Sequence, residues 1–484
     1  MFSDLSLPLS LLVLCQLFLS NRVHAAQQCR LQLNKNSLAG GGGDSGAPSE
    51  PTSTSTSAGD ATAPPTSPPT SPTASASSVP TPFAYGKTPI RGVNLQPWIT
   101  PSIFQNTGNE NIVDEFTFGS MQDPSTALSV LQNHWATWIT EEDFAAIAAA
   151  GLNHVRIPYG YWSVPLTSAD TDGSTSTAPY TPGAWPYLLK ALNWAKQYNI
   201  HVLLDLHGAP GSQNGFDNSG QRTGTPEWSI NPANISRTVD TIRFVTENLG
   251  GMVDIIELLN EPAAFSTNTF PATLRQYWQD GYSAVRAVMI GDGFLGVDSW
   301  TNFLTAPSNL DSQGVMMDYL SRSFQDHISF ACSSIQDLAN FATGNIWTVV
   351  GEWSTAPTDC TQWLNGRGVG ARWDGTWFIP NTPLGSCAGW TGSYSNFSAE
   401  YKTFLRQYWE VQVTMGESVQ GWIYWTWKVG APSYCLLPRL IFFRRRILMS
   451  GGTAPSIQLT DSIRTFAHED LSCKLYERTL RENR

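Results

Sequence analysis

Charged residues are scarce in this sequence, and basic residues are the scarcer kind. Only 14% of the 484 residues are charged, and 28 Lys and Arg stand against 39 Asp and Glu, which gives a formal net charge of −11 at pH 7. Nucleic acids and anionic membranes are bound through basic protein surfaces. The charge balance therefore argues against a nucleic-acid or anionic-membrane partner.

Long apolar runs are also missing from the body of the chain. No stretch there approaches the ~20 apolar residues that a membrane span needs, so we expect no membrane span in the mature domain. The N-terminus holds a shorter apolar run, from Leu7 to Leu19, followed by a small-residue cleavage pattern. This predicts a secretory signal peptide over residues 1–25 and a secreted protein, extracellular or in the cell wall. Because the leading segment contains Asp4 and no basic residue, a short signal-anchor is the alternative.

Metal and redox motifs are absent as well. The sequence contains 7 Cys and 7 His, without a Cys-x-x-Cys pair or a dense His and Cys cluster, so it predicts neither a zinc site nor a redox site. In an oxidising compartment, Cys360 and Cys387 are close enough in sequence to form a disulfide that closes one loop. Asn234 and Asn396 begin Asn-x-Ser sequons and are candidate N-glycosylation sites.

Low-complexity sequence separates the N-terminus from the rest of the chain. Residues 40–82 are almost only Gly, Ser, Thr, Pro and Ala, without apolar periodicity. Such a segment cannot bury enough apolar surface to offset its chain entropy. We therefore predict that residues 26–84 form a disordered, O-glycosylated linker or stalk, and that the globular part begins near Phe83.

Helical and strand patterns alternate through residues 85–428. A capping box at Thr140 begins one amphipathic helix, which we expect to stop at Gly151, and apolar residues from Leu188 to Ala195 predict another. Apolar runs of the kind found in parallel sheets lie at residues 154–158, 200–206, 253–259, 346–350 and 421–427. The alternation predicts an α/β fold, a (β/α)8 TIM barrel with insertions. An open doubly wound sheet is the alternative, although no Gly-rich phosphate loop follows any strand.

Two of the predicted strands deliver a glutamate directly after the apolar run, namely Glu261 and Glu352. In a (β/α)8 barrel the C-terminal ends of the strands form the face where chemistry occurs. Cleavage of a glycosidic bond requires paired carboxylates, because one protonates the leaving oxygen while the other attacks the sugar or activates water. A separation of about 5 Å gives retention, and about 6.5–9.5 Å gives inversion. The 19 Trp, 15 Tyr and 22 Phe suit a neutral, ring-shaped ligand such as a carbohydrate.

The sequences around both glutamates resemble a known enzyme family. Leu-Leu-Asn-Glu-Pro at 258–262 and Gly-Glu-Trp-Ser at 351–354 resemble the acid/base and nucleophile motifs of glycoside hydrolase family 5. The run at 205–220, which begins Asp-Leu-His-Gly-Ala-Pro-Gly, is similar to the fungal exo-β-1,3-glucanases within that family. The resemblance spans roughly residues 85–428. It implies a retaining barrel enzyme that releases glucose from the non-reducing end of β-1,3-glucan.

The resemblance also implies a role for each site residue. Glu261 would be the acid/base and Glu352 the nucleophile. Five further residues would serve the substrate: Arg156 by pairing with the nucleophile and keeping it ionised, His207 by contacting the first sugar, Phe216 by lining the entrance, Asn260 by holding the sugar 2-hydroxyl, and Trp427 as the floor under the −1 ring. Taken alone, Arg156, His207 and Phe216 are equally compatible with structural roles. The chemistry needs two carboxylates and water, so it implies no cofactor, and nothing in the sequence indicates more than a monomer.

Three departures from the family pattern bear on activity. After Leu95 the chain runs straight into Gln96, where the family has additional residues and a sugar-binding Glu, and after Tyr319 it lacks the family's His-x-Tyr strand end with its aromatic clamp. Residues 429–484 form a basic tail without Trp, which we expect not to belong to the family fold. The absent His-x-Tyr segment leaves a catalytically impaired glucan-binding protein open as an alternative. An endo-glucanase or β-1,6-glucanase of the same family also stays open, because its fold and carboxylates would be the same. A purely structural wall protein, supported only by the stalk, is a third.

Overall fold

The computed structural model describes residues 82–95, 101–170, 175–285, 288–303, 311–315, 324–379 and 381–428. The predicted signal segment 1–25, nearly all of the predicted linker 26–84 and the tail 429–484 lie outside these residues. The boundaries given for those segments therefore stay predictions.

Eight parallel strands close into a barrel, in which each strand pairs with the next along the chain and the last returns to the first. They are β1 (Ile90–Asn94), β2 (His154–Gly160), β3 (His201–Gly208), β4 (Ile255–Glu257), β5 (Val288–Gly291), β6 (Asp311–Val315), β7 (Trp347–Trp353) and β8 (Gly421–Tyr424). This order confirms the predicted (β/α)8 barrel. It is incompatible with the open doubly wound sheet, which would leave two strands unpaired on one side.

Two strands are shorter than the apolar runs that predicted them. β4 has only three residues, because after Glu257 the chain keeps single backbone hydrogen bonds to β5 and β3 without the regular ladder. β8 ends at Tyr424, and the backbone amides of Trp425 and Trp427 then donate to carbonyl groups of β7 and β1. Both irregular ends lie at the carboxyl edge of the barrel, where the candidate site residues are found.

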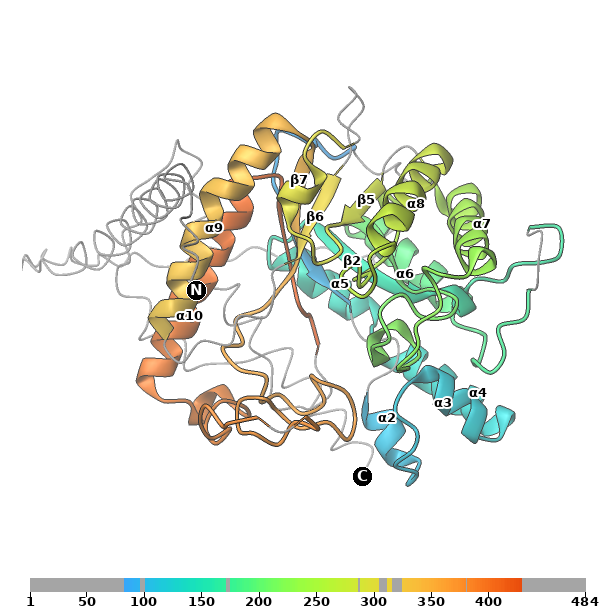
Figure 1. Ribbon diagram of the computed structural model, residues 1–484, viewed down its shortest axis with the longest axis horizontal. Helices are drawn as coiled ribbons and strands as arrows, with labels where there is room; N and C mark the ends of the chain where they lie inside the picture. Colours follow the sequence, from blue (N-terminus) through green and yellow to red (C-terminus); the bar gives the residue numbers. More distant parts are fainter. Residues whose placement is uncertain are drawn as a thin grey trace, which may run out of the picture.

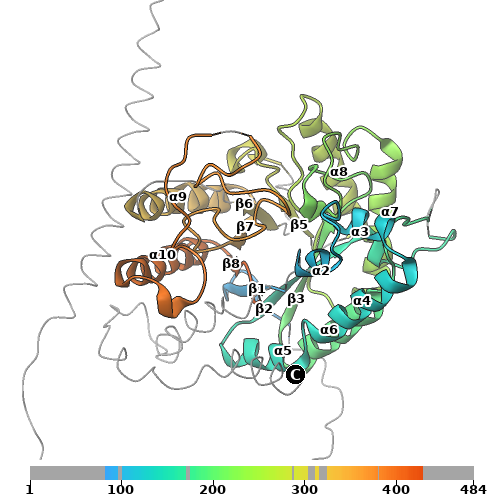
Figure 2. The same ribbon diagram turned by 90° about the horizontal axis from the view of Figure 1, so that it is seen from below.

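Helices lie around the barrel and at one of its ends (Figures 1 and 2). They are α2 (Pro101–Asn106), α3 (Glu115–Met121), α4 (Pro124–Thr137), α5 (Glu141–Ala149), α6 (Trp185–Gln197), α7 (Pro232–Leu249), α8 (Phe270–Ala284), α9 (Phe324–Gly344) and α10 (Ala399–Glu417), with short 3-10 helices η1 (Tyr161–Ser163), η2 (Asp217–Ser219), η3 (Val297–Trp300) and η4 (Tyr394–Asn396). None of the helices in the described part of the chain is both long and apolar enough to span a membrane.

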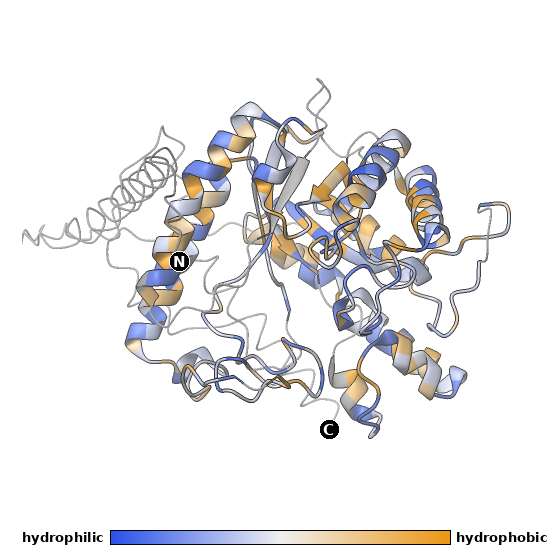
Figure 3. Ribbon diagram, viewed as in Figure 1, coloured by the Kyte–Doolittle hydropathy of each residue, from blue (hydrophilic) through white to orange (hydrophobic). Residues whose placement is uncertain are grey.

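The helix signals in the sequence correspond to observed caps and faces. Asp143 accepts the Thr140 N–H at 2.8 Å, which completes the predicted capping box at the start of α5. α6 buries Leu188 and Leu192 against the barrel. The helices in Figure 3 carry separate orange and blue faces, as expected for helices with one side on a core and one side in water.

The barrel interior changes from apolar to polar along the strands. Six buried residues fill the interior layer nearer the N-terminal ends of the strands: Ile90, Leu203, Ile255, Met289, Val349 and Ile423. Phe83 and Tyr85 pack against this N-terminal layer. Side chains two positions apart on a strand face the same side. Asp205 lies two positions after Leu203 on β3, and Glu257 lies two positions after Ile255 on β4, so both side chains also face inward. The inward positions nearest the C-terminal ends are therefore polar, and the candidate site lies there.

Candidate active site

A single arginine occupies the centre of this polar layer. Arg156 of β2 is completely buried. Its Nε and Nη2 atoms bond Glu257 at 2.7 and 3.0 Å, Nη2 also lies 3.0 Å from Asp205 and 2.8 Å from Asn260, and Nη1 lies 2.9 Å from Asn94 and 3.2 Å from Glu352. One guanidinium thus pairs with carboxylates from β3, β4 and β7, so that its buried charge is compensated from three sides.

His207 stands beside this cluster as a neutral ring. Its Nδ1 lies 2.6 Å from Asp205 Oδ2, and its Nε2 lies 3.3 Å from the side-chain amide nitrogen of Asn260. Burial and, to a smaller extent, the nearby Arg156 guanidinium lower the pKa of His207 to about 3. The ring therefore donates its one proton from Nδ1 to Asp205, and its Nε2 can accept the amide hydrogen of Asn260.

Glu352 lies at the end of β7, where the strand register is irregular between Val350 and Trp353. Its side chain is 26% exposed, while its Oε2 atom is held 3.2 Å from Arg156 Nη1. Burial raises the pKa of Glu352 to about 8; Arg156 opposes the shift, and the Glu261 carboxylate adds to it. The two glutamates that the sequence singled out therefore interact electrostatically in the folded chain.

Glu261 follows β4 in an uncommon backbone conformation. Its φ is +43°, in the left-handed region that residues other than glycine rarely adopt. Its Oε2 atom accepts a hydrogen bond of 2.6 Å from the side-chain amide of Asn218, and its carbonyl oxygen accepts one of 3.1 Å from Asn214. Such strain is maintained only where surrounding contacts fix it, and the loop after β3 supplies those contacts here.

The loop after β3 also carries the predicted entrance residue. Phe216 is 44% exposed and precedes η2. Within this loop, Gln213 donates its side-chain amide to the carbonyl oxygens of His207 and Asn260, at 2.8 and 2.9 Å. The loop is thus fixed to the ends of both β3 and β4, which places Phe216 at the rim of the polar cluster.

The two tryptophans after β8 have different surroundings. Trp427 is 8% exposed, and its indole N–H donates to Asp143 of α5 at 2.9 Å. Trp425 is half-buried, and its ring lies nearly parallel to the ring of His207, with centroids 6.2 Å apart. The structure therefore places Trp425 beside the sugar-contacting candidate His207, and it places Trp427, the predicted floor under the −1 ring, against α5.

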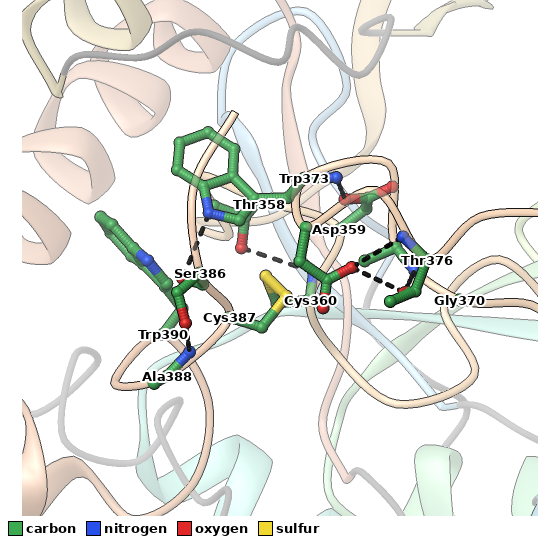
Figure 4. Close-up of a disulfide and its surroundings, with 12 residues drawn as sticks. Thr358, Asp359, Cys360, Gly370, Trp373, Thr376, Ser386, Cys387, Ala388 and Trp390 are labelled. Atoms are coloured by element: carbon green, nitrogen blue, oxygen red, sulfur yellow. Dashed lines mark hydrogen bonds between the residues drawn. A yellow bond between two sulfur atoms is a disulfide. The ribbon is translucent and has the colours of Figure 1, made fainter. Parts of the chain in front are cut away.

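The long loop after β7 is closed by a disulfide between Cys360 and Cys387, the pair that the sequence proposed, 27 positions apart (Figure 4). Next to it, Asp359 accepts the backbone amides of Arg372 and Trp373 at 2.8 and 3.0 Å. These contacts stabilise the loop that follows the strand carrying Glu352.

The two glycosylation candidates lie apart from the polar cluster. Asn396 is exposed on η4, whereas Asn234 is half-buried in the first turn of α7, where its amide nitrogen packs against Gly211. A cavity of about 130 Å³ is lined mostly by α4 and α6, and the residues that line it do not include those of the cluster. Among the described residues, no group of three His, Cys, Asp or Glu could hold a metal ion.

Comparison with known proteins agrees with this geometry. The sequence profile of the cellulase family, glycosyl hydrolase family 5, matches residues 116–331. The glucan 1,3-beta-glucosidase of Blumeria graminis is 40% identical over 382 residues, and the match covers 73% of this chain and 85% of that protein. The chain belongs to glycosyl hydrolase family 5.

Two further similarities concern the family 5 sequence and the family 5 fold. Glucan 1,3-beta-glucosidase 2 of Wickerhamomyces anomalus is 40% identical over 378 residues, covering 71% of this chain and 84% of that protein. The crystal structure of rutinosidase from Aspergillus niger has a TM-score of 0.53 and 20% identity, covering 73% of this chain and 94% of that one. At that identity the rutinosidase supports the fold alone. The chain is accordingly a glycoside hydrolase built on a (β/α)8 barrel.

Most predicted site residues of this family 5 hydrolase meet at one place. Contacts in the polar layer link Arg156, His207, Asn260 and Glu352, and Glu261 interacts electrostatically with Glu352. Phe216 stands at the rim, and Trp427 faces α5. The junctions at Gln96 and Tyr319, where the sequence departs from the family pattern, lie outside the described residues.

Five residues of the cluster were not assigned a role from the sequence, namely Asn94, Asp205, Asn218, Glu257 and Trp425. Strand alternation provides a signal for Glu257, which lies two positions beyond the inward-facing Ile255. The contact of Asn218 with Glu261 depends on a loop conformation that no period in the sequence specifies.

Proposed function

We propose that this family 5 hydrolase releases glucose from the non-reducing end of β-1,3-glucan with retention of configuration. Glu261 acts as the acid/base and Glu352 as the nucleophile. The observation that carries the proposal is the glutamate pair at the ends of two strands, with Arg156 holding one oxygen of Glu352. The linkage follows the printed names of the relatives, which are glucan 1,3-beta-glucosidases.

In the first step, Glu261 gives its proton to the glycosidic oxygen while Glu352 attacks the anomeric carbon. The carbon–oxygen bond breaks, and a glucosyl ester forms on Glu352. Arg156 Nη1 bonds Oε2 of Glu352, and Asn218 bonds Oε2 of Glu261. The Oε1 atoms of Glu352 and Glu261 are therefore the ones left to attack carbon and to carry the proton.

In the second step, the Glu261 carboxylate takes a proton from water, and the water oxygen attacks the anomeric carbon. The ester bond breaks, glucose leaves in the β configuration, and Glu261 is protonated again. Asn260 is held between Arg156 and His207, in a position to bond the sugar 2-hydroxyl, while Trp425 supplies the flat surface under the −1 ring.

Export is part of the proposal. The Cys360–Cys387 disulfide supports an oxidising compartment, as does the apolar segment at residues 1–25. In that setting the protein acts as a monomer on a cell-wall or external glucan, without a cofactor.

The acid/base assignment is tested with Glu261→Ala. Hydrolysis of laminarin should fall by about 10²- to 10⁴-fold, because the leaving oxygen is no longer protonated. Added azide should restore turnover of an activated aryl β-glucoside and give a β-glucosyl azide, because azide attacks the glucosyl ester without a base. Glu110→Ala, at an exposed glutamate, is the matched control and should behave as the unmodified chain does. Loss of activity without azide rescue would contradict the assigned role.

A glucan-binding protein without catalysis is the second candidate, favoured by the missing His-x-Tyr segment after Tyr319. It predicts retention on insoluble β-1,3-glucan together with no soluble product. Product analysis also separates the remaining alternatives, because an endo-acting glucanase releases oligosaccharides first and a β-1,6-glucanase prefers a β-1,6-linked polymer.

A further inference from the structure

Glu257 is a buried glutamate that the two-step reaction does not use. It ends β4, and its side chain is completely buried. Its two carboxylate oxygens accept hydrogen bonds from Nε and Nη2 of Arg156, at 2.7 and 3.0 Å. A bidentate contact of this kind fixes the plane of a guanidinium as well as its position.

Because Glu257 bonds Nε and Nη2 of Arg156, the direction of the third nitrogen, Nη1, is fixed. Nη1 points to Asn94, at 2.9 Å, and to Glu352, at 3.2 Å. Asn94 lies on β1 and is itself buried, and its side-chain amide donates to the carbonyl oxygen of Tyr424 on β8. The direction of Nη1 toward Glu352 is thus fixed by Glu257 on the opposite edge of the guanidinium and by Asn94 beside Nη1.

More negative than positive groups surround Arg156. Asp205 and Glu257 pair with it directly, the partly exposed Glu352 pairs with its Nη1, and Glu261 adds a fourth carboxylate nearby. His207, from β3, is neutral, since burial lowers its pKa to about 3. Among the described residues of the cluster, Arg156 is the one cation shared by these carboxylates, so Glu257 and Glu352 compete for it.

We propose that Glu257 is a positioning residue for the hydrolysis: it aims Arg156 at Glu352, and its negative charge limits how strongly Arg156 holds the ionised form of Glu352. The inference rests on the proposed function, in which ionised Glu352 is the nucleophile. Glu257 thus has two effects: a geometric effect, which depends on the length of its side chain, and an electrostatic effect, which depends on its charge.

The electrostatic effect has a definite sign. Burial raises the pKa of Glu352 to about 8, Arg156 lowers it, and Glu261, Asp205 and Glu257 raise it. Activity requires ionised Glu352, so kcat/KM increases with pH through this pKa, on the acidic limb of the profile. Burial raises the pKa of Glu257 itself to about 7, below that of Glu352, so Glu257 is ionised at the pH of the limb, and removing its charge moves the acidic limb to lower pH.

The test uses two variants of the full chain and an aryl β-glucoside as substrate. In Glu257→Gln the charge is lost while the length is kept, and we expect the acidic limb of kcat/KM to move down by about one pH unit, a tenfold change in proton affinity. In Glu257→Asp the charge is kept and the reach is shortened. There we expect kcat to fall by up to about 100-fold through misalignment, with no downward movement of the limb.

Glu115→Gln is the matched control. Burial raises the pKa of Glu115 to about 8, as it does for Glu352, but Glu115 lies outside the cluster and accepts a hydrogen bond from Trp162. The control should leave the limb where it is. An unmoved limb in Glu257→Gln, or an equal shift in the control, overturns the inference. If Glu257→Gln does not melt as a folded protein, Glu257→Asp decides, and an unchanged kcat there overturns it. If the unmodified chain cleaves neither laminarin nor the aryl glucoside, the proposed function itself fails and this inference with it.

Discussion

At the scale of single residues, two tryptophans that are only two positions apart have different surroundings. The aromatic run after β8 is visible in the sequence, but the side on which each ring lies depends on how the chain leaves the strand. Trp427 turns to Asp143 of α5, and Trp425 turns to His207. Sequence reasoning therefore found the segment, and the structure adds that Trp427 bonds a helix while Trp425 lies beside His207.

The two tryptophans should respond differently to truncation. Trp425→Ala should reduce kcat/KM by about 10- to 100-fold, which corresponds to the ~1–3 kcal/mol of one lost ring contact, with little change in the melting temperature. Trp427→Ala should destabilise the fold by about 3–5 kcal/mol, because it leaves a cavity and an unpaired Asp143 acceptor. Kinetics beside thermal unfolding of both variants checks this. A reversed pattern would return the floor of the site to Trp427.

At the scale of elements, the sequence predicted helices well and strand ends less well. The capping box at Thr140 is a local signal, and α5 begins there. The apolar run at 253–259 contains only a three-residue strand, because after Glu257 the chain makes only single backbone hydrogen bonds to its neighbouring strands. The contact of Glu257 with Arg156, 101 positions away, depends on the register between strands, which periodicity along one strand does not specify.

The loop after β7 gives a prediction at this scale. The disulfide closes 27 positions of chain. Replacing both partners, Cys360→Ser with Cys387→Ser, should lower the free energy of unfolding by about 3 kcal/mol, because the unfolded chain regains the freedom of an open loop. Urea unfolding with intrinsic fluorescence measures the change. An unaltered midpoint would mean that the contacts of Asp359 hold this loop without the disulfide.

At the scale of the whole molecule, closure of the barrel creates the site. β8 pairs with β1, and the amide of Asn94 reaches the carbonyl oxygen of Tyr424 across 330 positions of sequence. The alternation of strands and helices was enough to predict this architecture, since a repeated β/α unit has few ways to bury its strands. The polar contacts inside the barrel could be predicted only in part. Asn218 contacts Glu261 from a loop, and Glu352 lies in the part of β7 where the strand register is irregular.

The central claim is retaining hydrolysis of β-1,3-glucan by the Glu261 and Glu352 pair. The most direct test is proton NMR of the glucose released from laminarin by the 484-residue chain, recorded before the anomers equilibrate. We predict that β-glucose appears first and that Glu352→Gln, with an unchanged melting temperature, releases none. Appearance of α-glucose first, release by Glu352→Gln at the unmodified rate, or no release by the unmodified chain would contradict the claim.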